Sequence, residues 1–491
     1  LNSRKTITEL ILSNHDANCT ACTRNMKCEL QSLAKNLGID INRFENVLKM
    51  KPLDDHNPSI TRNANRCIKC GRCVDVCKEV QGIHVLERIG RGHDMDITPK
   101  FGKYLSDEFC TFCGQCANVC PVGAIMEKDN TDLVWEKLHD NDVHVMLQIA
   151  PAVRVSIGEA IGNKKGYIEL GKLVSAMKHL GFDHVYDTDF TADLTIMEEG
   201  TELIHRITNN GTLPMMTSCC PGWINYAEQK HPEILDHIST CKSPQQMFGT
   251  LAKTYYAQKE NIDPKNIFVV SVMPCTAKKY EAARKEFQTN PVLPDVDVVL
   301  TTRELGKMCY QMGINFDDLE DREFDDPFGI TTGAAALFGA SGGVMEAALR
   351  TVSEVVNKKP LENIDFKHVR GMEGIKEASV MLGGKEVKVA VSHSLSNAEK
   401  LVQEIKDGTS EYAFIEIMAC PGGCIGGGGQ PYGTNNKTRE ARMESTYFLD
   451  GNMAVRKSHE NPAIQKLYKE YLVKPLGEKS HHLLHTKYYP R

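Results

Sequence analysis

The spacing of the cysteines limits what this chain can fold into more than any other feature. The 491 residues include 18 cysteines, and two runs share the pattern C-x2-C-x2-C-x3-C. In paired runs of this kind, three cysteines hold one cubane and the fourth crosses to the other cubane. The spacing therefore predicts two [4Fe–4S] clusters, one held by Cys67, Cys70, Cys73 and Cys120, and the other by Cys110, Cys113, Cys116 and Cys77.

Zinc binding and disulfide formation fit these cysteine runs less well. Zinc knuckles use paired C-x2-C motifs, without a third cysteine in each run. A disulfide framework is typical of short secreted chains, and this chain is long enough to bury a large core without one. The segment from about residue 60 to 130 resembles a two-cluster bacterial ferredoxin.

A third metal motif lies upstream, with the spacing H-x3-C-x2-C-x5-C. Its four candidate ligands are His15, Cys19, Cys22 and Cys28. One histidine and three cysteines suit tetrahedral zinc as well as an iron–sulfur cluster, so the motif alone leaves both open. The two neighbouring clusters favour a third [4Fe–4S] cluster and hence a chain of electron carriers.

Composition restricts the class of protein. Hydrophobic residues make up 41% of the chain and charged residues 25%, and the formal net charge is −6. This balance excludes a disordered, collagenous or strongly basic nucleic-acid-coating protein. No apolar signal segment opens the sequence, and the longest uncharged run, 327–345, is rich in glycine and predicts a buried turn region. We therefore expect a cytoplasmic protein without nucleic-acid or membrane contacts.

After residue 141 the pattern changes to short apolar runs that alternate with amphipathic stretches. Strands are predicted at 143–150, 267–273, 296–300, 387–391 and 412–418, and a helix at 168–180 that ends at Gly181. Alternation of strands and helices favours parallel sheets with helices on their faces. Ligands of such sheets bind beyond the carboxyl ends of the strands.

Three more cysteine motifs stand at such strand ends. They occupy residues 217–223, 273–279 and 418–431 and contain Cys219, Cys220, Cys275, Cys420 and Cys424. Four thiolates from three separate loops suit one more cubane. The glycine run 426–429 lets the backbone approach a bulky ligand closely.

These three motifs resemble the signature loops of the [FeFe]-hydrogenases. The resemblance extends over nearly the whole chain and includes the tail 480–488. It implies an α/β catalytic domain of two lobes, each a parallel sheet flanked by helices, with the active site between them. An α+β two-cluster ferredoxin domain and a small module with one His and three Cys ligands precede it. The implied boundaries are 1–60 for the small module, 61–140 for the ferredoxin-like domain, 141–435 for the catalytic domain and 436–491 for a C-terminal extension like a small subunit.

The resemblance also implies a cofactor, the H-cluster. In the family, a [4Fe–4S] cluster shares one cysteine with a two-iron subsite that carries CO, cyanide and an azadithiolate. Cys220, Cys275, Cys420 and Cys424 match its ligands, with Cys424 as the bridge. Lys278 matches the lysine that binds one cyanide. The residues that match the cofactor's surroundings are Ala150, Pro151, Ser243, Gln245, Met273, Pro274 and Met418.

Five residues match the family's proton route, namely Cys219, Glu199, Ser239, Glu202 and Arg206. A free thiol with a pKa of about 8.5 can give and retake a proton near neutral pH. Glu199, Glu202 and Arg206 recur at i, i+3 and i+7, which places them on one face of a predicted helix. A solvated charged face has the same spacing, so only the family match favours the proton route.

The implied activity is reversible hydrogen conversion, 2H⁺ + 2e⁻ ⇌ H₂, with electrons relayed by three accessory [4Fe–4S] clusters to ferredoxin or a similar carrier. Maturation proteins are expected partners, because the two-iron subsite has to be installed. Three alternatives remain: the hydrogenase subunit of an NAD-linked electron-bifurcating complex with flavin subunits, a hydrogen sensor, and a non-catalytic iron–sulfur assembly protein. Cys219 argues against the sensor, and the complete cysteine loops argue against the assembly protein.

The sequence departs from the family pattern at three places. Pro421 stands where some relatives have histidine, and Ala152 where some have serine, which changes the polarity beside the two-iron site. No C-x4-C-x2-C run is present, so a plant-type [2Fe–2S] module is not expected within these residues. Cys241 and Cys309 match no metal motif and are expected in the core, and His481, His482 and His485 are expected at the surface or in packing contacts.

Overall fold

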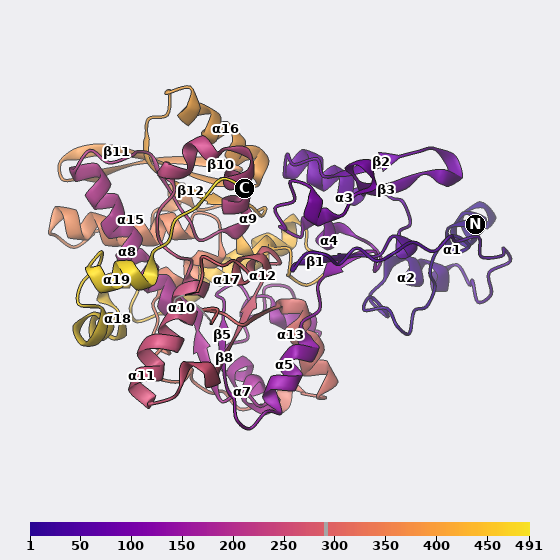
Figure 1. Cartoon of the computed structure of the whole chain (residues 1–491), viewed down its shortest axis with the longest axis horizontal. Coiled ribbons are helices and arrows are strands. Elements are labelled where there is room, and N and C mark those ends of the chain that lie inside the picture. The colour runs from indigo at the N-terminus through magenta and orange to yellow at the C-terminus, as the bar shows by residue number, and fades with distance from the viewer. Residues whose placement is uncertain (289–292) are drawn as a thin grey trace.

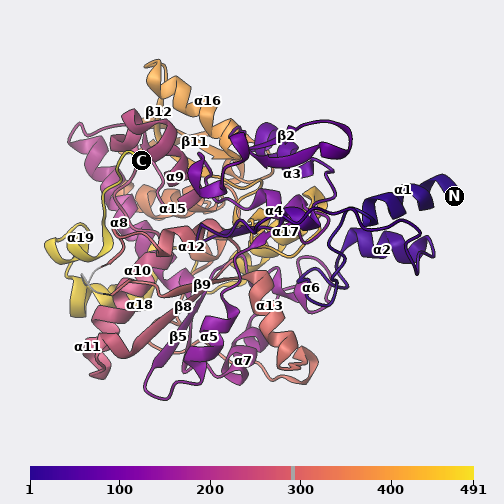
Figure 2. The ribbon, with the colours of Figure 1, turned by 45° about the vertical axis from the view of Figure 1, so that its right-hand side comes forward.

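A computed structural model describes residues 1–288 and 293–491 of the chain. Its parts follow one another along the long axis of the molecule, with the N-terminal module at one end and the catalytic domain at the other (Figure 1). The N-terminal module contains two helices, α1 (Asn2–Leu12) and α2 (Glu29–Asn36). A second view, turned by 45°, shows the same two helices apart from the rest (Figure 2). Among the described residues, none of the helices has the length and apolar character needed to cross a bilayer.

The ferredoxin-like domain contains two small antiparallel sheets. β1 (Ile60–Arg62) pairs with β4 (Ile125–Glu127), and β2 (Leu86–Ile89) pairs with β3 (Asp96–Pro99). Each cysteine run leads into a short helix, α3 (Arg72–Asp75) or α4 (Gln115–Val119). Gly71 and Gly114 precede these helices with φ values of 78° and 69°. Glycine adopts this left-handed conformation without strain, so the chain can turn sharply between the second and third cysteine of each run.

The first lobe of the catalytic domain is built on a four-stranded parallel sheet of order β6-β5-β8-β9. Its strands are β5 (His144–Ile149), β6 (His184–Asp187), β8 (Ile267–Met273) and β9 (Val298–Thr301). Helices of this lobe are α5 (Thr131–Leu138), α6 (Ile157–Ala160), α7 (Gly171–Leu180), α10 (Pro244–Leu251), α11 (Ala257–Glu260), α12 (Ala277–Ala282) and α13 (Thr302–Gln311). β5 and β8 are almost wholly buried, as expected for parallel strands covered on both faces.

The second lobe has a four-stranded sheet of order β10-β11-β12-β7. Its strands are β7 (Met215–Met216), β10 (Ile375–Leu382), β11 (Lys385–His393) and β12 (Tyr412–Met418). Its helices are α9 (Pro221–Lys230), α14 (Gly333–Ala336), α15 (Gly343–Asn357) and α16 (Leu395–Lys406). This sheet is mixed, because β10 runs antiparallel to β11. Gly383 and Gly384 connect them with φ values of 58° and 80°, and two successive positive φ values favour a tight hairpin turn.

A long helix and the C-terminal tail complete the catalytic domain. The helix α8 (Thr188–Thr208) packs against α10 of the first lobe and α15 of the second, and most of its residues are buried. The tail contains α17 (Asn436–Asn452), α18 (Pro462–Leu467) and α19 (Glu478–Leu484). α18 and α19 lie beside α8 at the edge of the domain that faces away from the N-terminal module (Figure 1).

Most of the predicted elements are present. Strands 267–273 and 412–418 have the predicted bounds, and the helix before Gly181 ends where expected, with Gly181 at φ 104°. The segment 327–345 is buried from Thr332 onward, but it is more regular than a turn region because it contains α14 and the start of α15. Its small residues fit a helix as well as a turn when neighbouring elements pack closely around them.

Candidate active site

The three cysteine loops of the catalytic domain meet between its two lobes. One loop follows β7, one follows β8 and one follows β12, so strands of both sheets end at the same place. Together they line a cavity of about 740 Å³, a volume that includes space open to solvent. Its lining includes Cys219, Cys220, Cys275, Cys420 and Cys424. The carboxyl ends of parallel strands, where ligands of such sheets bind, therefore enclose the candidate site.

The donor set suits an iron–sulfur cluster. Burial raises the pKa of Cys424 to about 12, and the charge of Cys220 adds to the effect. Burial, followed by the charges of Cys275 and Cys113, raises the pKa of Cys420. Cys420 is buried, and Cys220, Cys275 and Cys424 are partly buried. Four such thiols repel one another when ionised and need a cationic core to become thiolates, which is what iron supplies. The described residues therefore fit a cubane at this position.

Lys278 is the cation of the cavity. Its Nζ donates to the backbone oxygen of Cys219 at 3.1 Å and to Glu281 Oε2 at 2.9 Å. Burial works to lower the pKa of Lys278, but the ion pair with Glu281 outweighs burial and raises this pKa. The side chain is therefore a charged donor at the wall of the cavity.

Glu281 is a site residue that the sequence analysis missed. Its Oε2 accepts from Ser243 Oγ at 2.9 Å and from Gln245 Nε2 at 3.0 Å, in addition to Lys278. One buried carboxylate thus orients three polar side chains beside the cavity. The spacing Lys278-x2-Glu281 on a helix is the signal that could have identified it.

The other residues expected around the cofactor lie close to the cavity. The residues of this set that line it are Ala150, Pro151, Gln245, Met273, Pro274 and Met418. Ser243 does not line the cavity, but its Oγ donates to Glu281, which also accepts from Lys278 at the cavity wall. Ala152 also lines it, so a methyl group stands where some relatives have a serine hydroxyl.

The residues expected to carry protons converge at the buried side of α8. Glu199 and Glu202 point from this helix into the protein and are nearly inaccessible, so they do not form a solvated charged face. Burial, and after it the charge of Glu202, raises the pKa of Glu199 to about 8. Burial and the charge of Glu199 raise the pKa of Cys219, so this thiol and Glu199 are neighbours.

Glu202 is held by more partners than Glu199. Ser239 Oγ donates to its Oε2 at 2.8 Å, and the Thr240 N–H donates to the same oxygen at 3.1 Å. Arg206 binds its Oε1 through Nη2 at 2.6 Å, one turn further along α8. The structure therefore groups all five predicted residues, from Cys219 at the cavity to Arg206 near the surface.

One cysteine set of the ferredoxin-like domain surrounds a second cavity, of about 400 Å³. Its lining includes Cys67, Cys70, Cys73 and Cys120, which are the three cysteines of the first run and the last of the second. Burial, followed by the charges of Cys120 and Cys67, raises the pKa of Cys73 to about 12. The structure thus groups the set expected from the crossing pattern.

The other set lies nearer the catalytic domain. Burial and the charges of Cys113, Cys110, Cys73 and Cys77 raise the pKa of Cys116, which indicates that the remaining thiols are close together. Gln115 Nε2 donates to Gly426 O at 2.9 Å, and Asn118 Nδ2 donates to Gly427 O at 2.8 Å. The second cysteine run is therefore bonded to the loop that contains Cys420 and Cys424.

The upstream motif lies in the N-terminal module. His15 is buried, and its Nδ1 has no hydrogen-bond partner among the described residues. Burial, and then the charges of Cys22 and Cys28, raises the pKa of Cys19. A cysteine group with an unpaired buried imidazole nitrogen nearby fits a metal centre with mixed ligands.

The fold and the site together define an iron–sulfur oxidoreductase, in which electron-carrier modules lead to a buried cavity between two lobes. Sequence comparison identifies the family. The family described as iron only hydrogenase large subunit, C-terminal domain, matches residues 143–428, and the iron hydrogenase small subunit family matches residues 436–491. The chain belongs to the iron-only, or [FeFe]-, hydrogenases.

Two relatives and one solved structure illustrate this membership. The NADP-reducing hydrogenase subunit HndD of Solidesulfovibrio fructosivorans is 48% identical over 498 residues, which cover 100% of this chain and 85% of the relative. Iron hydrogenase 1 of Clostridium pasteurianum is 42% identical over 97% of this chain and 84% of the relative. A structure of the [FeFe]-hydrogenase HydA1 from Chlamydomonas reinhardtii superimposes with a TM-score of 0.67 at 42% identity, covering 74% of this chain and 99% of that one.

Two further families match the N-terminal part. The NADH-ubiquinone oxidoreductase-G iron-sulfur binding region matches residues 4–43, and the ferredoxin-like domain of NADH-quinone oxidoreductase subunit 3 matches residues 57–126. The chain is thus an iron hydrogenase, an oxidoreductase that interconverts protons and H₂ at an H-cluster, and it carries accessory iron–sulfur centres. The predicted family, activity and type of cofactor are confirmed.

Proposed function

We propose that Cys220, Cys275, Cys420 and Cys424 hold the cubane of the H-cluster, with Cys424 as the bridge to the two-iron subsite. The observation that carries this proposal is the cavity in which these four thiols meet Lys278 and Cys219. When bound, the H-cluster supplies the redox chemistry and the metal position at which hydrogen is activated. The chain supplies the ligands, a buried charge and a proton route.

Lys278 orients the anionic end of the cofactor in this proposal. An ammonium group brings three donors, of which two are used by the Cys219 carbonyl and Glu281. The third donor would be available to a cyanide ligand of the cofactor, and a charge-assisted bond at this position would be strong.

Protons pass between the cavity and the surface by Cys219, Glu199, Ser239 and Glu202, and Arg206 orients Glu202 at the outer end of this route. Cys219 lines the cavity, and Glu199, with a pKa of about 8, carries its proton at neutral pH and can donate it. Ser239 continues the proton route, because its hydroxyl donates a hydrogen bond to Glu202. Arg206 holds the Glu202 carboxylate at the outer end.

Three [4Fe–4S] clusters, when bound, would carry electrons to the cavity. His15, Cys19, Cys22 and Cys28 would hold the outermost cluster, Cys67, Cys70, Cys73 and Cys120 the middle one, and Cys77, Cys110, Cys113 and Cys116 the one nearest the active site. The second cysteine run is bonded to the catalytic domain, which disfavours a docking surface there, so the carrier binds near the exposed Cys19.

Infrared spectroscopy tests the assignment of the cavity. The protein matured with its two-iron subsite is expected to show bands of metal-bound CO and cyanide and to evolve H₂ with reduced methyl viologen. Cys424→Ala is expected to lose both signals, whereas Cys309→Ala, at a buried thiol outside the cavity, is expected to keep the bands. Bands of wild-type intensity in Cys424→Ala would contradict the assignment.

The relay role of Cys219 is tested by Cys219→Ala. We expect H₂ evolution to fall by at least about 10²-fold, because a positioned proton donor contributes 10²–10⁴-fold. Iron content and the CO and cyanide bands should stay close to wild type, since Cys219 is not among the proposed ligands. Turnover near the wild-type rate would refute the relay.

The ligand role of His15 is tested by His15→Ala and His15→Cys. A thiolate adds negative charge to the ligand set, so His15→Cys should lower the potential of one cluster, and His15→Ala should alter the electron paramagnetic signal of the same cluster. The signals of the other clusters serve as the internal control. Unchanged spectra in both variants would show that His15 is not a ligand.

The electron partner is either a ferredoxin or an NAD(P)-linked flavin subunit. The relative HndD is named as a subunit of an NADP-reducing hydrogenase, and the N-terminal families are those of NADH oxidoreductases, which favours a subunit of a larger complex. H₂-dependent reduction of ferredoxin by this chain alone supports the first choice. Reduction of NAD(P)⁺ only after co-expression with a flavin subunit supports the second.

A further inference from the structure

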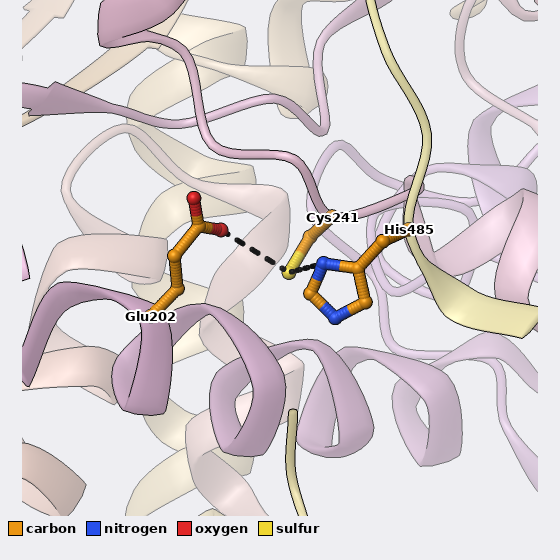
Figure 3. A group of neighbouring side chains, drawn as sticks. All are labelled: Glu202, Cys241 and His485. Carbon is orange, nitrogen blue, oxygen red and sulfur yellow. Dashed lines mark hydrogen bonds between the residues drawn. The ribbon is translucent and has the colours of Figure 1, made fainter. Parts of the chain in front are cut away.

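The C-terminal tail contacts the proposed proton route at Glu202, through residues that this route does not include. An antiparallel bridge pairs Cys241 with His485. Backbone bonds flank it, from Thr486 N–H to Thr240 O and from Lys242 N–H to Leu484 O, each at 2.8 Å. The bridge fixes the His485 ring beside Cys241 and Glu202, and one potential ligand atom from each of these three side chains lies within 4.8 Å of the others (Figure 3).

Both nitrogens of the buried His485 ring have partners. Nδ1 lies 2.8 Å from Thr240 Oγ1, and Nε2 lies 3.2 Å from Glu198 Oε2. Glu198 also accepts from Tyr468 OH at 2.5 Å and from Leu476 N–H at 2.8 Å, so it acts as an acceptor throughout. We assign the proton to Nε2 from these partners, which leaves the lone pair of Nδ1 facing Thr240.

The Thr240 hydroxyl stands between the imidazole and Glu202. Its oxygen is 3.3 Å from Glu202 Oε2 and 2.8 Å from His485 Nδ1. A hydroxyl can accept one proton while it donates another, so it can connect a carboxyl to an imidazole. Glu202 and His485 are therefore two hydrogen bonds apart.

Arg206 cannot replace this connection. Its guanidinium binds Glu202 and also donates to the carbonyl oxygens of Asp236 and Ile238, both at 2.9 Å. A guanidinium stays protonated at every pH relevant to proteins, so it orients Glu202 but does not take up its proton.

We propose that His485 is a proton-carrying group of this hydrogenase, which exchanges protons with Glu202 through the Thr240 hydroxyl. The inference rests on the proposed route through Glu202. On the outward path, the Glu202 proton moves to Thr240 Oγ1 as the Thr240 proton moves to His485 Nδ1. Thr240 is unchanged, Glu202 becomes a carboxylate and His485 an imidazolium, and H₂ formation uses the reverse path.

The surroundings of His485 suit a group that changes charge. Glu198 and Glu202 face it from α8, so two carboxyl groups lie beside the ring. Cys241 faces it from the paired loop, with a pKa raised by burial, and Tyr468 faces Glu198 from the preceding segment. His481 is exposed and stacks on the His485 ring, with the two ring centroids 4.7 Å apart, so the His481 ring lies between His485 and solvent. Lys487 lies on the same segment and is also exposed.

His485→Gln is the direct test, because an amide keeps hydrogen-bonding capacity but does not titrate near neutral pH. We expect H₂ evolution with reduced methyl viologen to fall at least about tenfold and to slow further in D₂O, with unchanged CO and cyanide bands. His482→Gln is the matched control, since that side chain is exposed and makes no hydrogen bond within the described ranges. It should keep the wild-type rate.

Chemical rescue separates proton transfer from a structural role. His485→Ala should be slow, and free imidazole should restore its rate in proportion to the concentration of neutral imidazole. Absence of rescue would overturn the inference, as would a wild-type rate in His485→Gln. If His485→Ala does not fold, the rate of His485→Gln in D₂O decides between the two roles. Further slowing in D₂O supports proton transfer, and an unchanged rate contradicts it. Failure of the proposed function is recognised by a different result: the wild-type protein would show neither H₂ evolution nor the infrared bands.

Discussion

At the scale of single residues, the site depends on a few buried charges whose protonation is set by their surroundings. Glu199 and Glu202 are three residues apart on α8, yet their surroundings differ. Glu202 is bonded to Arg206, Ser239 and Thr240, whereas neither oxygen of Glu199 has a hydrogen-bond partner in the part of the chain that the structure describes. A buried carboxyl without strong donors keeps its proton at neutral pH.

This difference predicts the pH dependence of turnover. Glu199 has a pKa of about 8, so H₂ evolution should fall as pH rises through about 8 and the carboxyl loses its proton. Glu199→Gln should lower the rate by about 10²–10⁴-fold and remove this limb from the pH profile. If Glu199→Gln kept the wild-type rate and the same fall in rate above pH 8, another group would be the cause of that fall.

The same pKa has a consequence for stability. A carboxyl whose pKa rises on folding from 4.5 to about 8 favours the folded state fully below pH 4.5, and this contribution is lost as pH rises through 8. Urea unfolding of the wild type should therefore show a falling free energy of unfolding between about pH 5 and 8. Glu199→Gln should show a smaller fall over the same range.

At the scale of elements, the glycine run 426–429 holds three loops together. A Cβ atom on Gly427 would lie 2.1 Å from Pro274 O, and one on Gly428 would lie 2.2 Å from Cys113 O. The glycines therefore allow close approach to neighbouring backbone, rather than only to a ligand as the sequence suggested. The loop thereby joins the second cysteine run of the ferredoxin-like domain to the active-site loops.

Gly428→Ala should push the loop of the ferredoxin-like domain that contains Cys113 away from the catalytic domain. We expect a loss of about 1–3 kcal/mol in the free energy of unfolding, which is typical of overpacking, together with slower H₂ uptake with viologen as acceptor. Gly451→Ala is the control, because Gly451 lies in α17 with no atom within 4 Å of an added Cβ. It should be neutral or slightly stabilising, and equal stability of the two variants would contradict the packing argument.

At the scale of the whole molecule, buried ion pairs join the C-terminal tail to the catalytic lobes. Asp450 of α17 accepts from Arg350 Nη1 at 2.7 Å and from Arg456 Nη2 at 2.6 Å. The Arg350 and Asp450 side chains are both fully buried. The extension 436–491 therefore forms part of the catalytic unit in this structure.

Asp450→Asn should destabilise the protein, because it leaves the Arg350 charge buried with fewer partners. Removal of one partner of a buried pair costs about 3–5 kcal/mol, so thermal unfolding should shift to clearly lower temperature. Lys388→Gln is the control, since Lys388 pairs with Glu411 at the exposed surface. It should leave the unfolding temperature unchanged, and similar shifts in both variants would contradict the role of the buried network.

Much of the site was predictable because its signals are local or repeated. Cluster ligands need fixed short spacings, so the two C-x2-C-x2-C-x3-C runs specified which cysteines to expect together. Strand ends were predictable from apolar runs such as 267–273, which β8 matches. Glu281 and His485 were missed as site residues. The spacing Lys278-x2-Glu281 was a local signal for Glu281, but no local pattern reports the contact of His485 with distant residues.

The sequence by itself determined the family, the metal motifs and the alternation of strands and helices, since these follow from spacing and hydrophobic period along the chain. Only the tertiary structure decided that the edge strand β10 is antiparallel, that Glu281 orients Lys278, and that the tail brings His485 to Glu202. Each of these depends on the way distant segments pack, and packing is set by the complete set of neighbours rather than by any one stretch of sequence.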